Sequence, residues 1–329
     1  MRISWIMAGG MLLTSLVFTG YSDASSTQGD QSAAKTAAVS KHHHKVRHKH
    51  RRKIRKAAHR RETVGAGGLP RLQSSAAMVF DEDDSKALFT KNPGVSQPIA
   101  SITKLMTAMV LLDANLPGDE KITVTEADVD TLRNSSSRLR VGTTLSRREM
   151  LRLALMSSEN RAAFALARTY PGGTQAFVAA MNRKAAQLGM RHTHFVDPTG
   201  LHSDNVSTAA DLVELVKAGY RYQTIRNFTT TASYDVDVRG RRHSVEFRNT
   251  NALVRNKNSR WHIGLSKTGY INESGRCLVM HANIANKSLI IVLLDSWGRD
   301  SRIGDANRIK RWIENTTVSR YSRGGNGVS

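Results

Sequence analysis

The sequence predicts an α/β fold of the α+β type, in which strands from both ends of the chain form one antiparallel sheet and a helical lobe is inserted between them. Three observations predict this fold. Two short strand-like segments, 76–80 and 87–90, flank an acidic turn. The stretch from about 118 to 230 has mostly helical patterning. Three strand-like segments and a helix then close the chain, at 261–268, 276–281, 289–295 and 307–314.

Local signals position the helices of the lobe. We expect Pro98 to open a buried apolar helix that runs to residue 112. Ser146 is a capping residue for the helix that follows it, and Thr208 and Asp211 have the spacing of a capping box. Further helices are expected at 158–168, 174–188 and 208–219, and a small hairpin at 234–238 and 243–247, closed around Gly240.

The first 24 residues have the features of a secretory signal. Arg2 precedes the uncharged run 3–19, and small residues at Ser22 and Ala24 suit a signal peptidase, so we predict cleavage after Ala24. An uncleaved anchor is the alternative, although the run is at the short edge for a membrane-spanning helix. We therefore expect an exported, periplasmic protein that is soluble or peripherally associated with a membrane.

Positive charge is concentrated ahead of the folded part. The chain has 49 Lys and Arg against 27 Asp and Glu, a net charge of +22, and residues 31–61 hold twelve of the basic residues and no acidic one. Such a self-repelling stretch predicts a disordered Lys/Arg/His-rich segment and linker over 25–70. It is either a solvated spacer, as charge runs usually are, or a tether to anionic polymers or a membrane surface. We expect no specific nucleic-acid partner, a folded domain over 71–317 and a flexible tail over 318–329.

Residue types exclude several kinds of site. Cys277 is the only cysteine, which excludes internal disulfides and cysteine-based zinc or iron–sulfur sites, and its apolar neighbours predict a small buried side chain. The chain lacks the H-E-x-x-H motif, and His192 and His194 have no convincing third ligand. We therefore expect no metal and no cofactor. The G-x-S-x-G motif of α/β hydrolases is also absent.

Three short motifs carry the candidate chemistry. The spacing of Ser101 and Lys104 puts both on one helix face, and a lysine desolvated in an apolar wall can serve as the base for a serine nucleophile. S-E-N at 158–160 follows in a turn between helices, and K-T-G at 267–269 ends a strand beside which an extended peptide can lie. The order and spacing of these motifs are those of the active-site serine penicillin-binding proteins and β-lactamases.

Four longer segments make the resemblance more specific. They are 99–109 (IASITKLMTAM), 155–163 (LMSSENRAA), 195–201 (FVDPTGL) and 265–269 (LSKTG). They resemble the low-molecular-mass D-alanyl-D-alanine endopeptidases, close relatives of the D,D-carboxypeptidases of peptidase family S11, and the likeness covers about 70–316. It implies a β-lactamase/transpeptidase-like fold with a five-stranded antiparallel sheet and flanking helices. We expect the endopeptidase type, because the chain leaves no room for the C-terminal β-domain and membrane-binding helix that the carboxypeptidases often carry.

The resemblance implies a role for each motif residue. Ser101 would attack a D-alanyl carbonyl and form an acyl-enzyme, and Lys104 would accept its proton. Ser158 would relay that proton to the leaving amine, and Lys267 would tune the local field. The substrate would be bound by Asn160, Thr268, Gly269 and Tyr270, and the backbone N–H groups of Ser101 and Tyr270 would form the oxyanion hole. Many relatives have Asp or Gly in place of Glu159, so the role of that residue stays open.

The implied substrate is the peptide part of peptidoglycan, cut between D-alanine and meso-diaminopimelate, with β-lactams as covalent inhibitors. A D,D-carboxypeptidase that releases terminal D-alanine is the main alternative. A class A β-lactamase needs a deacylating glutamate in an E-x-x-L-N context, and neither Glu214 nor Glu246 has that context. Two non-catalytic alternatives are a penicillin sensor and a protein that binds anionic polymers. The complete set of motif residues argues against the sensor, and the concentration of charge outside the folded part weakens the polymer-binding alternative.

Overall fold

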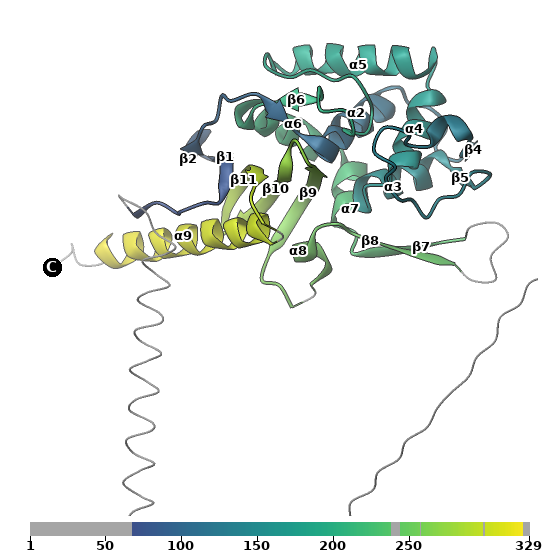
Figure 1. Cartoon of the computed structure of the whole chain (residues 1–329). Helices are drawn as coiled ribbons and strands as arrows, with labels where there is room; N and C mark the ends of the chain where they lie inside the picture. The colour runs from purple at the N-terminus through teal and green to yellow at the C-terminus, as the bar shows by residue number, and fades with distance from the viewer. Residues whose placement is uncertain (1–67, 238–243, 257, 299, 325–329) are drawn as a thin grey trace, which may run out of the picture. The chain divides into compact units, whose positions relative to one another are not determined.

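A five-stranded antiparallel sheet in the order β2–β1–β11–β10–β9 organises the fold (Figure 1). The computed structural model describes residues 68–237, 244–256, 258–298 and 300–324, all within one compact unit of residues 59–329. The strands of the sheet are β1 (Ser74–Asp81), β2 (Lys86–Lys91), β9 (His262–Ile271), β10 (Gly275–Ile284) and β11 (Lys287–Ser296). Strand β1 pairs with β11, so both ends of the domain meet in one sheet, and the predicted fold class is confirmed.

Both faces of the sheet are covered, which explains why its central strands are almost continuously apolar. On β10, Cys277 and Val279 belong to the core cluster shared with the helical lobe, whereas Leu278 and Met280 belong to the cluster shared with helix α9 (Ser301–Gly324). Successive side chains of a strand point to opposite faces, so each face of the sheet contributes to a separate core. The core shared with the lobe also contains Ile102 and Leu105, the neighbours of Ser101 and Lys104 along the chain.

The helical lobe lies between β2 and β9 along the chain. Its helices are α2 (Lys104–Asp113), α3 (Arg147–Met156), α4 (Asn160–Arg168), α5 (Gly173–Gln187), α6 (Ala209–Tyr220), α7 (Gln223–Thr230) and α8 (Ala252–Arg255), with short 3₁₀ segments η2 (Ala100–Thr103) and η3 (Glu126–Asp128). Its short strands are β3 (Gln97–Pro98), β4 (Lys121–Thr123), β5 (Thr144–Ser146), β6 (Val206–Ser207), β7 (Ser233–Val236) and β8 (Val245–Arg248). None of the described helices combines the length and the apolar character that crossing a membrane requires.

The start of the active-site helix differs from the prediction. Pro98 does not open the helix, because it lies in the short strand β3 and pairs with Val206 of β6. Ala100, the first residue of the 3₁₀ segment η2, then has a left-handed backbone with φ +47°, and helix α2 follows η2 from Lys104. A proline has a backbone that suits a strand as well as a helix start, so the sequence alone does not separate the two.

Other local predictions are confirmed or corrected. Ser146 caps α3 in a full capping box with Glu149. Thr208 caps α6, but the carboxylate of Asp211 accepts hydrogen bonds from the backbone N–H of His192 and the hydroxyl of Thr193, so the reciprocal half of the predicted box is absent. Helix α4 begins at Asn160 instead of residue 158.

The hairpin is present as predicted, whereas the last helix is longer than predicted. The strands β7 and β8 form the predicted hairpin, whereas the turn around Gly240 lies outside the described residues. Helix α9 continues to Gly324, so it passes through residue 318, where we expect the flexible tail to begin. The predicted signal at 1–24 and the basic segment both lie outside the described residues.

Candidate active site

Ser101 and Lys104 lie at the junction of η2 and α2, one turn apart. In a 3₁₀ turn the side chains at positions i and i+3 eclipse each other, which brings the two groups together directly. The Lys104 Nζ is 2.9 Å from the Ser101 Oγ. Lys104 is completely buried, whereas Ser101 lines an open cleft.

The surroundings of Lys104 favour the neutral amine. Its Nζ donates to the Asn160 Oδ1 at 2.8 Å and to the backbone oxygen of Thr199 at 2.7 Å. Burial lowers the pKa of Lys104 to about 7, although the negative charges of Asp197, then Glu159 and Asp130, oppose this shift. A neutral amine has two N–H donors and one lone pair. When both donors are used on these two oxygens, the lone pair is left for the hydroxyl of Ser101.

A second serine and lysine face the first pair from other elements. The Lys267 Nζ, on β9, donates to the Ser158 Oγ at 2.8 Å and to the backbone oxygen of Thr268 at 2.9 Å. Burial, followed by the positive charges of Lys104 and Arg302, holds the pKa of Lys267 well below its usual value. Ser158 has a left-handed backbone with φ +63° in the turn between α3 and α4, and such strained positions cluster at functional sites.

Close backbone approach explains the glycine of the K-T-G motif. A Cβ atom on Gly269 would lie 2.8 Å from the backbone oxygen of Ile99 and 3.2 Å from the backbone N of Ser101. Real side chains almost never tolerate the first of these distances, so only glycine lets β9 lie against η2 here. The backbone N of Ser101 therefore lies at the edge of β9, next to the residue that precedes Tyr270.

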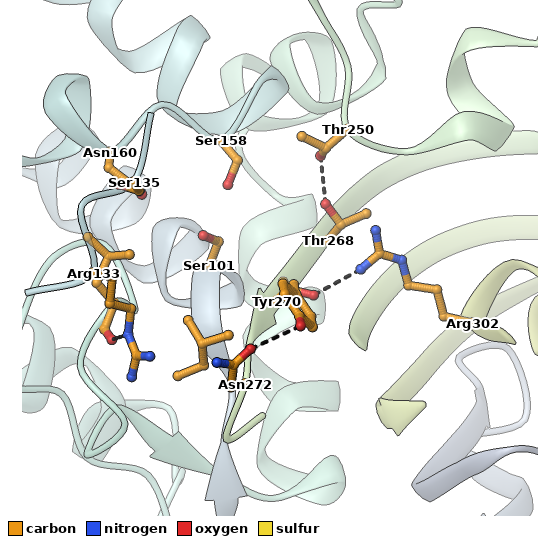
Figure 2. Close-up of a pocket in the computed structure, with 13 residues that line it drawn as sticks. Ser101, Arg133, Ser135, Ser158, Asn160, Thr250, Thr268, Tyr270, Asn272 and Arg302 are labelled. Carbon is orange, nitrogen blue, oxygen red and sulfur yellow. Dashed lines mark hydrogen bonds between the residues drawn. The ribbon is translucent and has the colours of Figure 1, made fainter. Parts of the chain in front are cut away.

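An open cleft of about 440 Å³ brings the predicted residues together (Figure 2). Six of them line it: Ser101, Ser158, Asn160, Thr268, Gly269 and Tyr270. The other two, Lys104 and Lys267, are buried and touch the lining through their hydrogen bonds to Ser101 and Ser158. All eight predicted site residues therefore belong to one site.

Several residues that line the cleft lie outside the three sequence motifs. Ser135 accepts a hydrogen bond from the Asn160 Nδ2 at 2.9 Å, and Thr250 accepts one from the Thr268 Oγ1 at 2.6 Å. Arg302, on α9, donates to the backbone oxygens of Gly269 at 2.9 Å and Cys277 at 3.2 Å. Leu201, the last residue of the segment 195–201, also lines the cleft, and the remaining lining residues are Arg133, Ile271 and Asn272.

Arg302 gives one end of the cleft a positive charge. In Figure 2 its guanidinium lies beside Thr268 and Thr250. Burial lowers the pKa of Arg302 to about 10, so the group stays charged at neutral pH. It forms no ion pair with any carboxylate in the described part of the chain. This end of the cleft is therefore suited to a substrate carboxylate.

Glu159, whose role the sequence left open, has a defined set of contacts. The residue is only 9% exposed, and its two carboxylate oxygens accept hydrogen bonds from the Ser137 Oγ at 2.7 Å and the backbone N–H of Arg138 at 3.3 Å. Burial raises its pKa. Glu159 thus holds the loop that carries Ser135, the hydrogen-bond partner of Asn160.

The described residues contain no cluster of three or more side chains that could hold a metal ion. Cys277 is buried, and burial raises the pKa of its thiol to about 11, which agrees with the predicted structural role. Neither Glu214, on α6, nor Glu246, on β8, lines the cleft, so neither is placed to act as a deacylating base.

Comparison with known proteins assigns the family. A family model described as D-alanyl-D-alanine carboxypeptidase, peptidase S11, matches residues 63–298. The chain belongs to this family.

Two relatives of this S11 peptidase are described as D-alanyl-D-alanine endopeptidases. The one from Pseudomonas aeruginosa is 48% identical over 255 residues, which cover 77% of this chain and 82% of the relative. The one from Escherichia coli K12 is 46% identical over 249 residues, which cover 76% of this chain and 80% of the relative. Among solved structures, the DD-transpeptidase of Streptomyces K15 has a TM-score of 0.68 and 29% identity, covering 74% of this chain and 98% of that one. The predicted transpeptidase-like fold and the predicted family are therefore confirmed.

Proposed function

We propose that this S11 peptidase is a serine-type D-alanyl-D-alanine endopeptidase of peptidoglycan, which cuts the D-alanyl–meso-diaminopimelate crosslink through an acyl-enzyme. The observation that carries the proposal is the 2.9 Å contact between the Ser101 hydroxyl and the buried amine of Lys104, in a cleft beside a strand edge. The two endopeptidase relatives, at 48% and 46% identity, favour the endopeptidase over the carboxypeptidase.

Acylation begins at Ser101. Its Oγ attacks the D-alanyl carbonyl carbon while the neutral amine of Lys104 takes the hydroxyl proton. The developing oxyanion is bound by the backbone N–H groups of Ser101 and Tyr270. The close approach of Gly269, the residue before Tyr270, to the backbone N of Ser101 supports this assignment. The C–N bond then breaks, and Ser158 relays to the leaving amine the proton that Lys104 took from Ser101. Lys267, hydrogen-bonded to the Ser158 Oγ, stabilises the oxygen through which the proton moves. Water hydrolyses the ester and frees Ser101.

The leaving group is held at the end of the cleft where Arg302 lies. In the crosslink, the amine that leaves belongs to a carbon that also carries a carboxylate, as it does in a terminal D-alanine. Arg302 and the hydroxyl of Thr268 are placed to bind that carboxylate, and Asn160 is placed to bind the amide of the acyl part. Since both kinds of leaving group carry this carboxylate, this contact serves endopeptidase and carboxypeptidase alike.

The test is to digest purified crosslinked muropeptide dimers and uncrosslinked pentapeptide monomers side by side. We expect the dimers to be converted to monomers, with Ser101→Ala as the inactive control. Efficient release of free D-alanine from the pentapeptide, with the dimers left intact, would overturn the endopeptidase and establish a carboxypeptidase. β-Lactams are expected to acylate the same serine.

We further propose that the protein acts in the periplasm after export and removal of residues 1–24. The uncharged run and the small residues before Ala24 support this. The expected N-terminus of the protein recovered from the periplasm is Ser25, and N-terminal sequencing measures it. Recovery with Met1 intact in the membrane fraction would instead establish the uncleaved anchor.

A further inference from the structure

An ion pair crosses one end of the cleft, away from the catalytic serine. Arg133, which lines the cleft, donates from its Nη2 to the Glu273 Oε1 at 2.9 Å. Glu273 lies in the turn between β9 and β10, next to the lining residue Asn272. In Figure 2, Arg133 and Asn272 lie toward one end of the cleft, and Thr250 and Arg302 toward the other. The two partners of this pair come from segments 140 residues apart in the sequence.

The guanidinium of Arg133 is held in place before any ligand arrives. The Arg133 Nε, which is part of the guanidinium, donates to the backbone oxygen of Leu201 at 2.5 Å. The backbone N–H of Arg133 donates to the Asp130 Oδ1 at 3.0 Å and so holds the main chain of the residue. The side chain is only 22% exposed, whereas that of Glu273 is 47% exposed. The Arg133 Nη1 makes no hydrogen bond to any described residue. The cleft therefore has a fixed positive group and an adjacent negative group at this end.

The proposed function decides which part of the substrate reaches this pair. With the leaving-group carboxylate at Arg302, the acyl part extends the other way along the edge of β9, past Tyr270 toward Asn272. The residue before the D-alanine has its Cα about 3.8 Å further along the stem. In a diaminopimelate stem, the side chain of that residue ends in a carbon that carries both a carboxylate and an ammonium group.

We propose that Arg133 and Glu273 form a subsite for this zwitterionic end of meso-diaminopimelate in the acyl-donor stem. Arg133 binds the carboxylate and Glu273 binds the ammonium group, each through a charge-assisted hydrogen bond. The inference rests on the proposed function for the direction of the stem. It goes beyond that function because it assigns the donor-side specificity to two residues outside the catalytic motifs.

Three substrates that differ only in this third residue separate the two contacts. The first carries meso-diaminopimelate. The second carries L-lysine, which is the same side chain without its carboxylate, and the third carries 2-aminopimelate, which is the same side chain without its ammonium group. The second and third substrates each lose one charge-assisted hydrogen bond that the first can make. We therefore expect kcat/KM for the first substrate to exceed that for each of the others by roughly tenfold.

Two variants should remove these preferences separately. Arg133→Gln should cut the diaminopimelate and lysine substrates with equal kcat/KM and still discriminate against 2-aminopimelate. Glu273→Gln should cut the diaminopimelate and 2-aminopimelate substrates with equal kcat/KM and still discriminate against the lysine substrate. Each comparison is made within one variant, so a general loss of activity cancels. Because Glu273 is half-exposed, we expect Glu273→Gln to keep the melting temperature of the wild type. Arg133→Gln also gives up the hydrogen bond to the backbone oxygen of Leu201, so we expect it to melt slightly lower.

Glu214→Gln is the matched control. Its partner is the Lys217 Nζ at 2.9 Å, and the side-chain exposures of 28% and 45% are close to those of the cleft pair. This variant should keep both preferences. The inference is overturned if the wild type cuts the three substrates equally, or if either cleft variant keeps the preference that it should lose. The donor stem is common to both reactions, so the test is run on crosslinked dimers and on pentapeptides. A chain that cuts only pentapeptides would overturn the proposed function and leave this test intact.

Discussion

At the residue scale, the chemistry depends on keeping an amine uncharged in the interior. Lys104 is completely buried, and burial brings its pKa to about 7. At that pKa the neutral form is abundant at neutral pH, and the proton that it accepts from Ser101 can be passed on again. The same burial that lowers the pKa also holds the Nζ at hydrogen-bond distance from Ser101, Asn160 and Thr199.

The rate of penicillin acylation should therefore rise with pH. Below pH 7 the amine is protonated and has no lone pair, so the rate should fall about tenfold for each pH unit, and above pH 7 it should level off. Labelled penicillin measures this rate. Ser101→Ala should abolish labelling and Lys104→Ala should block it. A rate that is flat between pH 5 and pH 8, or labelling of Ser101→Ala, would contradict the roles proposed here.

Glu159 is a second buried group that acts through its contacts, and we predict that it positions the Asn160 amide. Glu159→Ala leaves the Ser137 Oγ and the Arg138 N–H without their acceptor, which should cost about 1–3 kcal/mol of stability and slow acylation. Glu159→Gln keeps one acceptor oxygen and should restore most of both. Urea denaturation and penicillin labelling measure the two effects. If Glu159→Ala acylates as fast as the wild type, the positioning role is wrong.

At the element scale, the turn between α3 and α4 presents its serine at a conformational cost. Ser158 is left-handed, with φ +63°, and Lys267 binds its hydroxyl from β9. Left-handed backbone costs a residue with a Cβ atom roughly 1–2 kcal/mol, and glycine avoids this cost. The short turn therefore stores strain in order to aim one hydroxyl at the cleft.

Two substitutions at this position should separate function from strain. Ser158→Ala and Ser158→Gly both remove the hydroxyl, so both should lose hydrolysis of the substrate. Ser158→Gly should nevertheless be more stable than Ser158→Ala by about 1 kcal/mol in urea denaturation, because it relieves the left-handed backbone. The neighbouring Ser157, with φ −99°, provides the control: its glycine variant should gain nothing over its alanine variant. If glycine is more stable than alanine by the same amount at Ser157 and at Ser158, backbone strain at Ser158 is not the explanation.

At the scale of the whole molecule, charge is divided between the folded domain and the segment ahead of it. Residues 31–61 hold twelve Lys and Arg, no carboxylate and six of the twelve histidines. A charge excess of this kind attracts polyanions, and the attraction weakens as salt shortens the Debye length from ~10 Å at 0.1 M to ~3 Å at 1 M.

We therefore expect the mature chain to co-sediment with purified cell wall or anionic vesicles more than a chain that begins at Glu62. Binding should be lost at 1 M salt, and it should strengthen below about pH 6.5 as the histidines become charged. Equal binding by the two chains, or binding that is indifferent to salt, would instead support the solvated spacer.

The parts of this protein that the sequence predicts are those that depend on neighbours along the chain. The strands of the sheet are visible as apolar runs, Ser146 as a cap and Ser101 with Lys104 as one helical turn, because each depends on contacts within a few residues. The motif order then identifies the family, although it does not show which groups touch.

Only the tertiary structure decides what completes the cleft. Arg302 donates to Gly269 from a helix 33 residues further along the chain. Thr250 and Thr268 are 18 residues apart in the sequence, and Arg133 and Glu273 are 140 residues apart, yet each pair is hydrogen-bonded. These are ordinary residue types in no recognisable pattern, and packing of the lobe against the sheet sets their distances. The pKa of Lys104 has the same origin: the sequence marks the lysine, but the burial that lowers its pKa exists only after η2, α4 and the segment at Thr199 have closed around it.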